Sequence, residues 1–451
     1  MKIIIAGAGR VGGSLAEMLC REGHDITLID KDAETISHIS NTVDAICIVG
    51  SATNPDVLSD AGAREADVFL AMTEQDEVNM ICGAAAHHLG TKHIVARVRD
   101  PQYLGKSDFL ESALGISSLV NPEYECAAEI SRNLRLPSAA RVDNFSKGRV
   151  EIAEYRILKD GPLDGAQLKD LRHRFGAKVL VSLIERNGQP QIPNGDFIIR
   201  NEDILSITGT AEELKRFFSA VSSAKSVKSA MIMGGGRISI YLARLLIRSG
   251  IAVTIIENDR KTCDSICELI PEACVICGDA TRSEVLLEEG IKDSDAFVAL
   301  TGDDGDNIIT SIYARHCGVR KSVTKINHEH FAEVVNSSDL DSIVIPKEIV
   351  VNHITRYVRA LSDSEGGGMK TLYRLCDGQA EAIEFRVNGE AGYTGAPLRE
   401  LKLKKDVLIA NIVRNKKSIL PDGDTVIQIG DHVVIVALEG KVRGLDDILA
   451  N

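Results

Sequence analysis

Two stretches of this chain share one pattern: an apolar strand, a glycine-rich turn, an amphipathic helix and a second strand that ends on an acid. The first copy opens its turn with Gly7 and ends on Asp30, and the second has Gly234 and Glu257 at those places. Both intervals between the copies are 227 positions. This order of elements is typical of a dinucleotide-binding βαβ unit. Two matched units predict two α/β domains and indicate that binding, rather than chemistry, is their purpose.

The duplication continues beyond the glycine turns. The stretch Gly50–Arg97 aligns with Gly278–Lys325 without gaps, and 17 of the 48 positions are identical. One inserted residue between the second and third strands changes the offset from 227 to 228. The whole sheet-forming segment is therefore repeated.

Short apolar runs alternate with helical stretches in each copy. In the first copy the expected strands are Ile3–Ala6, Asp25–Asp30, Ala45–Val49, Val68–Met72 and His93–Arg97. The expected covering helices are Val11–Glu22, Ala33–Ile39, Asn54–Ala61 and Glu77–Leu89. Such alternation predicts a doubly wound parallel sheet with right-handed crossovers, as in Rossmann-like domains.

A longer helix that opens on proline follows each sheet, at Pro122–Leu136 and Pro346–Leu361. After the linkers Pro137–Gly148 and Ser362–Gly368, strands separated by Pro, Gly and Asp turns predict a small α+β domain, with one helix near Asp164–Phe175. The expected fold is thus two Rossmann-like domains, each followed by a small α+β domain. The predicted boundaries are 1–136, 141–225, 228–361 and 369–451.

Composition narrows the class of protein. The net charge of −13 argues against nucleic acid as a general partner, because a phosphate-binding surface is basic. No apolar run reaches the roughly 18–20 residues that span a bilayer. Met1 and Lys2 lead straight into the first strand, which leaves no room for a signal peptide. We therefore expect a cytoplasmic protein that does not insert into a membrane.

The ten cysteines are expected to be reduced thiols. The tightest cluster is Cys263, Cys267, Cys274 and Cys277, and its C-x-x-C spacing makes a structural zinc site an alternative. The favoured interpretation is that Cys274–Cys277 forms a buried strand. In this interpretation Cys274 aligns with Cys47 of the first copy, which has no comparable set of cysteines around it.

The glycine turns predict nucleotide sites. Gly7 permits the tight turn, Gly9 lets the backbone approach a pyrophosphate, and Gly12 allows close packing of helix and strand. The free N–H groups of the following helix attract the phosphates. Asp30 can accept hydrogen bonds from the ribose hydroxyls and repels a 2′-phosphate, which favours NAD or an adenine nucleotide over NADP. A turn kept only for packing is the alternative.

Later strand ends add candidates, because ligands of parallel sheets lie at the carboxyl edge. In the first copy these are Ser51, Thr73, Glu74 and Arg97. Arg10 and Arg237 begin the helices after both turns and are either phosphate ligands or solvated cations. The second copy departs from the first at Ser239, Glu257, Gly302 and Asp279, so the two sites are expected to differ in affinity or preference.

No convergent catalytic set accompanies these sites. The histidines are scattered, His328 and His330 flank Glu329 in an expected solvated turn, and no nucleophile elbow, P-loop lysine or H-E-x-x-H motif occurs. An NAD-dependent oxidoreductase needs a group that moves a proton beside the hydride, and usually a large, unlike substrate domain. That class therefore remains the alternative to a non-enzymatic sensor. A scaffold with vestigial sites is a third interpretation.

Taken together, the chain resembles the RCK family of potassium-transport regulators, which combine KTN and TrkA-C domains. The resemblance rests on the Gly7–Gly12 turn with Asp30, on Gly50–Thr53 and Gly278–Thr281, on the Thr73-Glu-x-Asp-x-x-Asn79 motif, and on the Pro-Asn-Gly-Asp and Pro-Asp-Gly-Asp turns of the small domains. It covers essentially the whole chain, including the double order of domains.

The resemblance implies a ring of RCK domains on the cytoplasmic face of the cell membrane, bound to a potassium channel-like membrane subunit of the TrkH or TrkG type. It implies NAD(H), and ATP or ADP, as ligands of the sheet domains. In the first copy the implied contacts are Gly7, Ala8, Gly9, Arg10, Val11, Asp30, Thr73, Glu74 and Arg97. In the second they are Gly234, Gly235, Gly236, Arg237, Ile238, Glu257, Asp279, Thr301 and Lys325.

Overall fold

The computed structural model describes residues 1–100, 103, 107–136, 141–146, 148–221, 227–328, 330–331, 340–362, 369–376, 379–438, 442 and 444–450. The chain forms two compact units, each built from two separate stretches. Unit 1 combines Met1–Ser131 with Lys228–Val358, and unit 2 combines Arg132–Val227 with Arg359–Asn451. Both sheet domains therefore belong to unit 1, and both small domains belong to unit 2.

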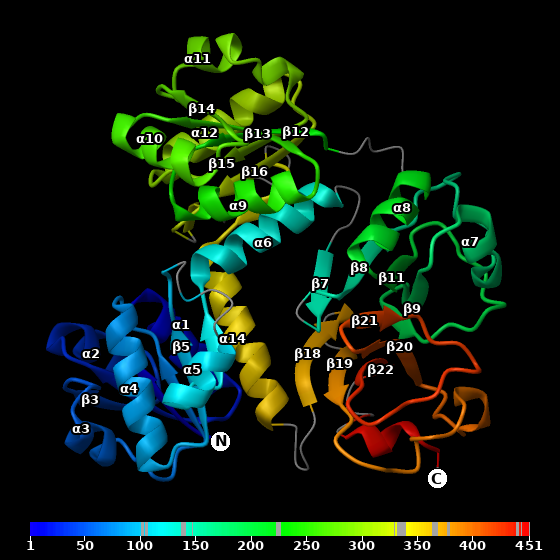
Figure 1. The fold of residues 1–451 in the computed structure, drawn as a ribbon, viewed down its shortest axis with the longest axis horizontal. Helices are drawn as coiled ribbons and strands as arrows, with labels where there is room; N and C mark the ends of the chain where they lie inside the picture. The colour runs from blue at the N-terminus through cyan, green and yellow to red at the C-terminus, as the bar shows by residue number, and fades with distance from the viewer. Residues whose placement is uncertain are drawn as a thin grey trace. The chain divides into compact units, whose positions relative to one another are not determined.

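The first sheet domain is a parallel sheet in the order β3-β2-β1-β4-β5-β6 (Figure 1). Its strands are β1 (Lys2–Ala6), β2 (Asp25–Asp30), β3 (Ile46–Val49), β4 (Val68–Ala71), β5 (His93–Arg97) and β6 (Ser118–Val120). Its helices are α1 (Arg10–Arg21), α2 (Ala33–Ser40), α3 (Pro55–Asp60), α4 (Asp76–Leu89), α5 (Ser107–Leu114) and α6 (Pro122–Arg135). All four residues of β4 are buried, as expected for a central strand covered by helices.

The second sheet domain repeats this topology in the order β14-β13-β12-β15-β16-β17. Its strands are β12 (Ser229–Met233), β13 (Ala252–Glu257), β14 (Cys274–Cys277), β15 (Ala296–Ala299), β16 (Lys321–Lys325) and β17 (Ile343–Val344). Its helices are α9 (Arg237–Arg248), α10 (Arg260–Leu269), α11 (Ser283–Glu288), the 3₁₀ turn η2 (Ile291–Asp293), α12 (Asp304–His316) and α14 (Pro346–Ser362). Both sheets have the Rossmann strand order, in which the glycine turn follows the central strand.

A tyrosine joins the two sheet domains within unit 1. The hydroxyl of Tyr241 in α9 donates to the Arg99 carbonyl at 3.3 Å and accepts from the Asn121 side-chain amide at 3.3 Å. The ring of Tyr241 also meets that of Tyr124 edge-on, with centroids 5.8 Å apart. These contacts place the start of α6 against a helix of the other sheet domain.

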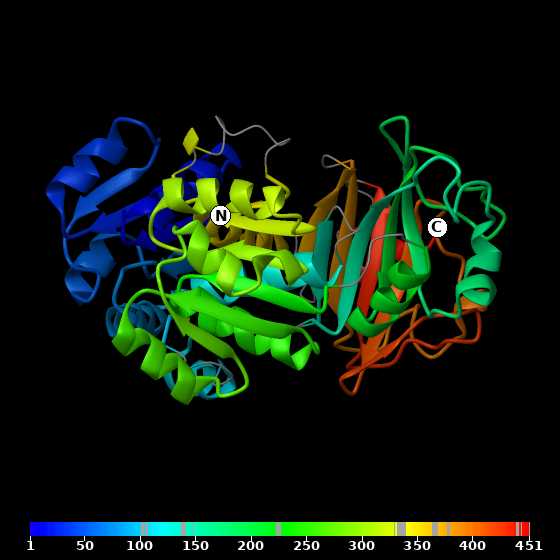
Figure 2. The same ribbon diagram turned by 90° about the horizontal axis from the view of Figure 1, so that it is seen from above.

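Unit 2 contains two antiparallel sheets, ordered β10-β9-β11-β8-β7 and β18-β19-β22-β20-β21. The first small domain contains β7 (Arg141–Phe145), β8 (Val150–Arg156), α7 (Leu168–Phe175), β9 (Leu180–Arg186), β10 (Gln189–Gln191), β11 (Ile204–Gly209) and α8 (Ala211–Val221). The second contains β18 (Met369–Leu375), β19 (Ala380–Arg386), η4 (Leu398–Glu400), β20 (Val407–Arg414), β21 (Lys417–Ile419), β22 (His432–Leu438) and η5 (Leu445–Ile448). Residues of both sheets, Phe145 and Val434 among them, share one apolar cluster, and Figure 2 shows the sheets side by side.

The small domains repeat an internal ion pair. Arg186 binds Asp203 through two hydrogen bonds of 2.7 Å, and Arg414 binds Asp431 through bonds of 2.8 and 2.7 Å. Each aspartate side chain is 1% exposed, so the bidentate geometry compensates for the burial of its charge. The repeated arginines and aspartates of the sequence are thus structural.

Two predictions about the small domains were wrong. The expected linker Pro137–Gly148 contains β7, whose Val142 and Phe145 are buried although the segment is mostly polar. The small domain has a second helix, α8, whose buried face includes Leu214, Phe217 and Phe218 at helical spacing. Of the second predicted linker, residues 363–368 lie outside the described part of the chain.

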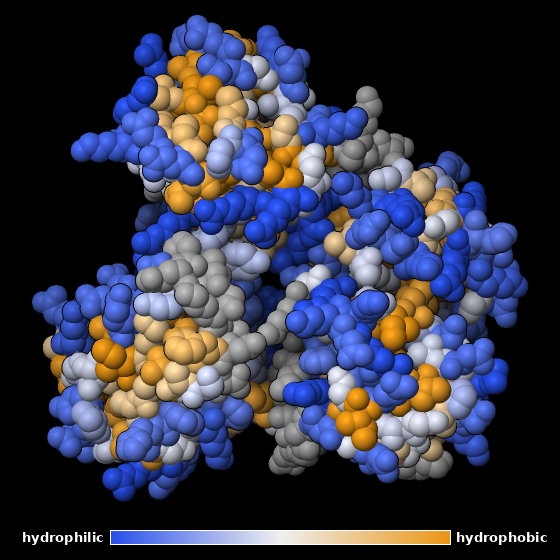
Figure 3. Space-filling model, viewed as in Figure 1, coloured by the Kyte–Doolittle hydropathy of each residue, from blue (hydrophilic) through white to orange (hydrophobic). Residues whose placement is uncertain are grey.

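In the described part of the chain, no helix has the length and apolar character that crossing a bilayer requires. The face drawn in Figure 3 is mainly hydrophilic, with smaller apolar patches among the charged side chains.

Candidate nucleotide-binding sites

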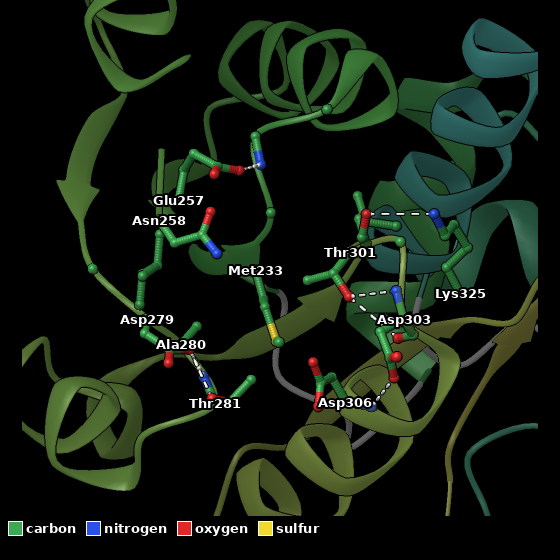
Figure 4. Close-up of a pocket in the computed structure, with 17 residues that line it drawn as sticks. Met233, Glu257, Asn258, Asp279, Ala280, Thr281, Thr301, Asp303, Asp306 and Lys325 are labelled. Atoms are coloured by element: carbon green, nitrogen blue, oxygen red, sulfur yellow. Dashed lines mark hydrogen bonds between the residues drawn. The ribbon is translucent and has the colours of Figure 1, made fainter. Parts of the chain in front are cut away.

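A cavity of about 570 Å³ opens at the carboxyl edge of the second parallel sheet (Figure 4). Five neighbouring strands contribute residues at their carboxyl ends. These are Met233–Gly236 at the end of β12, Glu257 and Asn258 at the end of β13, Gly278–Thr281 after β14, Leu300–Asp303 after β15, and Lys325 at the end of β16. Asp306 of α12 also lines it. The volume lies within the range of small-molecule sites, about 300–1,000 Å³.

The structure brings most of the residues predicted for the second site to this cavity. These are Gly234, Gly235, Gly236, Glu257, Asp279, Thr301 and Lys325. Arg237 and Ile238 lie in the first turn of α9 beside it, and Arg237 is exposed. Sequence reasoning missed Asn258, Thr281, Asp303 and Asp306. The position of Asp303 at the start of a helix could have been predicted, because Asp is a preferred N-cap residue. In the structure its carboxylate caps α12 by accepting from the Asp306 N–H at 2.9 Å.

Two glycines in the first turn are required by the fold itself. Gly7 has φ +100°, and a Cβ there would lie 2.9 Å from the Met72 carbonyl carbon. A Cβ on Gly12 would lie 1.8 Å from the Gly7 oxygen, which no rotamer change can relieve. In the second copy Gly234 has φ +98°, so the strained turn is repeated.

The middle glycine of each turn has no such requirement. Gly9 and Gly236 have φ near −65° and −70°, and a Cβ at either position would meet nothing within 4 Å. Both are N-cap residues of twelve-residue helices, and neither provides a side-chain cap, so the first N–H groups keep their hydrogen-bonding capacity. Internal packing leaves these two glycines unexplained, whereas close approach of an anionic ligand explains them.

The acid at the end of the second strand supports the turn in both copies. Asp30 accepts from the Ala8 N–H at 2.6 Å and from the Asp32 N–H at 2.9 Å. Glu257 accepts from the Gly235 N–H at 2.6 Å and from the Asp259 N–H at 2.8 Å. A carboxylate has about four lone-pair positions, so each acid retains acceptor capacity for a ligand.

The longer acid of the second copy is matched by a smaller residue in the turn. A Cβ on Gly235 would lie 3.0 Å from the Glu257 Cγ and 2.7 Å from the Ile266 Cδ1. The first copy has Ala8 at this position, opposite the shorter Asp30. The longer side chain of Glu257 therefore comes too close to residue 235 for an alanine methyl group to fit without movement.

Ser239, which replaces the third glycine, is fully buried, and its hydroxyl has no hydrogen-bond partner among the residues that the structure describes. Because even the Cβ is excluded at Gly12, the serine requires a looser helix–strand contact in the second copy. This departure distinguishes the two turns physically.

A buried asparagine organises the far side of each site. Asn79 accepts from the Thr73 N–H and hydroxyl at 2.9 and 2.7 Å and donates to the carbonyls of Thr73 and Arg97. Asn307 makes the same four bonds to Thr301 and Lys325. The repeated Thr and Asn of the motif thus join two strand ends.

A cation lies at the same place in both domains. In the first, Arg97 donates to the Thr73 carbonyl at 3.2 Å, and in the second, the Lys325 ammonium lies 3.5 Å from the Leu300 carbonyl. Burial lowers the pKa of both side chains, since it disfavours their charged forms. An anionic ligand would relieve that cost.

The remaining candidates are exposed loop residues. The Ser51 hydroxyl bonds that of Thr53 at 2.8 Å, and Glu74 is exposed with Gly302 as its counterpart. Asp279 accepts from the Thr281 hydroxyl at 2.7 Å, and this bond, with one from the Thr281 N–H, lowers the pKa of the aspartate. Val11, like Arg10, lies in the first turn of α1.

Two expectations about the cysteine cluster are corrected. Strand β14 is an edge strand, which leaves Cys274 and Cys277 exposed rather than buried. Its register pairs Thr254 with Cys274, as β2 pairs Thr27 with Ile46, so the counterpart of Cys274 is Ile46 and not Cys47. The inserted residue precedes β14 and causes the shift.

Other potential metal ligands are engaged within the protein. The His328 Nδ1 bonds the Asp304 carboxylate at 2.7 Å, and Glu329 lies outside the described residues. No group of three or more His, Cys, Asp or Glu side chains within the described residues could hold a metal ion.

Comparison with known proteins identifies the family to which this chain belongs. The TrkA-N domain model matches residues 3–122 and 230–346, and the TrkA-C domain model matches residues 152–222 and 382–450. The chain belongs to the TrkA family. The Trk system potassium uptake protein TrkA homolog of Archaeoglobus fulgidus is 31% identical over 99% of this chain and all of its own. The Trk system potassium uptake protein TrkA of Halomonas elongata is 33% identical over 98% of this chain and 96% of its own.

Solved structures share the fold of this TrkA-family chain. The GsuK channel bound to NAD matches with a TM-score of 0.64 and 19% identity, over 97% of this chain and 76% of the channel. GsuK bound to ADP matches with a TM-score of 0.50 and 16% identity, over 79% of this chain and 69% of its own. At these identities the likeness concerns the fold alone.

Proposed function

We propose that this chain is a nucleotide-sensing regulatory subunit of a Trk-type potassium uptake system. The names of its relatives support the transport role. The observation that supports nucleotide binding best is the pair Gly9 and Gly236, whose lack of a side chain leaves the backbone open to close approach of a ligand. Asp30 and Glu257 then receive the ribose hydroxyls, and the N-termini of α1 and α9 receive the phosphates.

The ligands are NAD(H) and adenine nucleotides, and the two sites divide them by charge. The second cavity has four acids and one base: Glu257, Asp279, Asp303, Asp306 and Lys325. The positions of the first domain that correspond to this cavity carry two acids and two bases. These are Asp30, Glu74, Lys31 and Arg97. Because like charges repel, the first site suits ATP or ADP, and the second suits the less highly charged NAD.

Binding acts on transport by shifting a conformational equilibrium. A ligand can do so only through different affinities for two states, and this requires neither a nucleophile nor a proton-transfer group. We therefore propose a regulatory role without enzymatic activity. It lies on the cytoplasmic face of the cell membrane, bound to a potassium channel-like subunit of the TrkH or TrkG type.

Self-association into a ring is part of this proposal. Ile81 in α4 and Ile309 in α12 occupy the same position in the two copies and are 57% and 69% exposed. We expect these two repeated, exposed side chains to lie in the interface between chains. Replacing both with Glu should reduce the molar mass measured by analytical ultracentrifugation, and an unchanged mass would argue against these helices as the interface.

The central test is calorimetric titration of NADH, ATP and ADP against the wild type, Asp30→Ala and Glu257→Ala. Each variant should lose one site, with ATP lost in Asp30→Ala and NADH in Glu257→Ala. Potassium flux into liposomes that contain the membrane subunit then tests regulation. Flux that ignores the double variant would refute the gating role, and sustained NADH turnover with small acids or aldehydes would favour an oxidoreductase.

A further inference from the structure

Two thiols lie together beside the second cavity. Cys263 in α10 is buried, and its Sγ donates to the Glu257 carbonyl at 3.3 Å. Cys277, the last residue of β14, is exposed and lies opposite Glu257 in the register of the two strands. Both cysteines therefore lie beside the backbone of Glu257. An accessible thiol and a buried thiol thus lie next to the same residue of the proposed nucleotide site.

The first sheet domain shows that packing does not require cysteines here. Its counterpart of Cys263 is the buried Ile36, and Val49 pairs with Asp30 as Cys277 pairs with Glu257. Aliphatic side chains therefore satisfy the same positions of the same fold. The thiol pair is a property of the second domain alone, which indicates a chemical role.

We propose that Cys263 and Cys277 are an oxidisable dithiol that forms a disulfide and thereby weakens nucleotide binding at the second site. The oxidant is a peroxide. Attack of the exposed Cys277 thiolate on hydrogen peroxide breaks the O–O bond and gives a sulfenic acid and hydroxide, which takes up the thiol proton to form water. The Cys263 sulfur then attacks the Cys277 sulfur, the S–S bond forms, the S–O bond breaks and a second water leaves. Two thiols and one peroxide thus give one disulfide and two waters.

The order of the two steps follows from the surroundings of each thiol. Cys277 is open to solvent, whereas burial raises the pKa of Cys263 to about 11 and keeps it protonated in the resting protein. Cys263 is thus protected from direct oxidation and is placed to resolve the sulfenic acid of its neighbour. In a reducing compartment the pair returns to two thiols by exchange.

The disulfide acts on residues that line the cavity. The Cys263 proton leaves, so the hydrogen bond to the Glu257 carbonyl is lost. The sulfur atoms must also close to about 2.05 Å, which draws α10 toward the end of β14. Glu257, Gly278 and Asp279 all line the cavity at this edge. The effect on affinity rests on the nucleotide function proposed above, whereas disulfide formation does not.

Peptide mapping of the full chain tests the bond itself. After peroxide treatment and alkylation, trypsin and Glu-C cleavage should release TCDSICE (262–268) joined to ACVICGDATR (273–282), with Cys267 and Cys274 alkylated. Cys277→Ser should abolish the joined peptide. A link between Cys267 and Cys274, or oxidation of Cys277 to sulfinic acid without a link, would overturn the proposal.

Calorimetry tests the consequence. Oxidation should weaken NADH binding at the second site about fivefold or more, the lower end of allosteric coupling, and dithiothreitol should restore it. The matched control is Cys263→Ile with Cys277→Val, which installs the residues of the first domain and should bind NADH insensitively to peroxide. A mapped disulfide with unchanged affinity would refute the regulatory effect, and absence of NADH binding to the reduced wild type would instead refute the nucleotide function.

Discussion

The match between Gly235 and Glu257 gives the sharpest prediction. A methyl group on residue 235 would lie 3.0 Å from the Glu257 Cγ and 2.7 Å from the Ile266 Cδ1. Ile266 can move, because only the end of its side chain is involved. Glu257 cannot move without breaking its bonds to the N–H groups of Gly235 and Asp259, at 2.6 and 2.8 Å. Gly235→Ala therefore expels the carboxylate from its position at the cavity.

The expected loss of binding is that of a hydrogen bond to a charged group, about 1.5–3 kcal/mol. This corresponds to about 10- to 150-fold weaker NADH binding at the second site. Glu257→Asp alone should also weaken binding, because the shorter acid leaves a gap beside a glycine. The double variant Gly235→Ala with Glu257→Asp recreates the pairing of Ala8 with Asp30 and should bind within about threefold of the wild type.

Calorimetry in an Asp30→Ala background measures the second site in isolation and closes this double-mutant cycle. A coupling energy of at least about 1 kcal/mol between the two substitutions is expected. The reasoning would be refuted if the two losses simply added. Ala8→Gly beside Asp30 is the matched control in the first domain, where only a small void is created and affinity should change little.

Three further predictions concern the turn, pH and the small domains. Gly9→Ala should weaken nucleotide binding and leave the thermal midpoint of unfolding unchanged, whereas Gly12→Ala should lower that midpoint. Equal changes of the midpoint in the two variants would contradict the assignment of Gly9 to the ligand and of Gly12 to the fold. Burial lowers the pKa of Lys325, and a bound anion should raise that pKa. The affinity of the second site for its ligand should therefore fall as pH rises toward 10.5. The variant Lys325→Arg should show a flatter dependence of affinity on pH. Burial tends to raise the pKa of Glu384, but its 2.7 Å hydrogen bond with His432 and two bonds of 2.8 Å from Ser146 outweigh this and lower the pKa from 4.5. The charge of Glu384 therefore stabilises the fold above pH 4.5, and this contribution is lost as pH falls through the lowered pKa. Glu384→Gln should lower the free energy of unfolding, measured with urea, by about 1–3 kcal/mol at neutral pH but not at low pH.

Strongly periodic elements were predictable from local pattern. The strand Asp25–Asp30 has the predicted bounds, because an apolar run between turn residues has few alternatives in a parallel sheet. The strand His93–Arg97 also has the predicted bounds, although it is short and half polar. Strand β7 was not predictable in this way. It is mostly polar, and its pairing with β8, over Arg141–Phe145 against Glu154–Val150, is what makes it a strand.

The two glycine turns, their acids, the duplication and the fold class could all be predicted before the structure, because each depends on residue type at fixed spacing. The sequence also located differences between the copies, at Ser239 and Glu257, but their physical consequences required the tertiary structure. The Glu257 Cγ lies 3.0 Å from where a Cβ on Gly235 would be, and the Ser239 hydroxyl has no partner among the described residues. Cys263 and Cys277 both lie beside the backbone of Glu257. Each of these relations joins residues that are distant along the chain. The directions of their side chains follow from strand register and helix packing, and the local sequence pattern does not specify either of these.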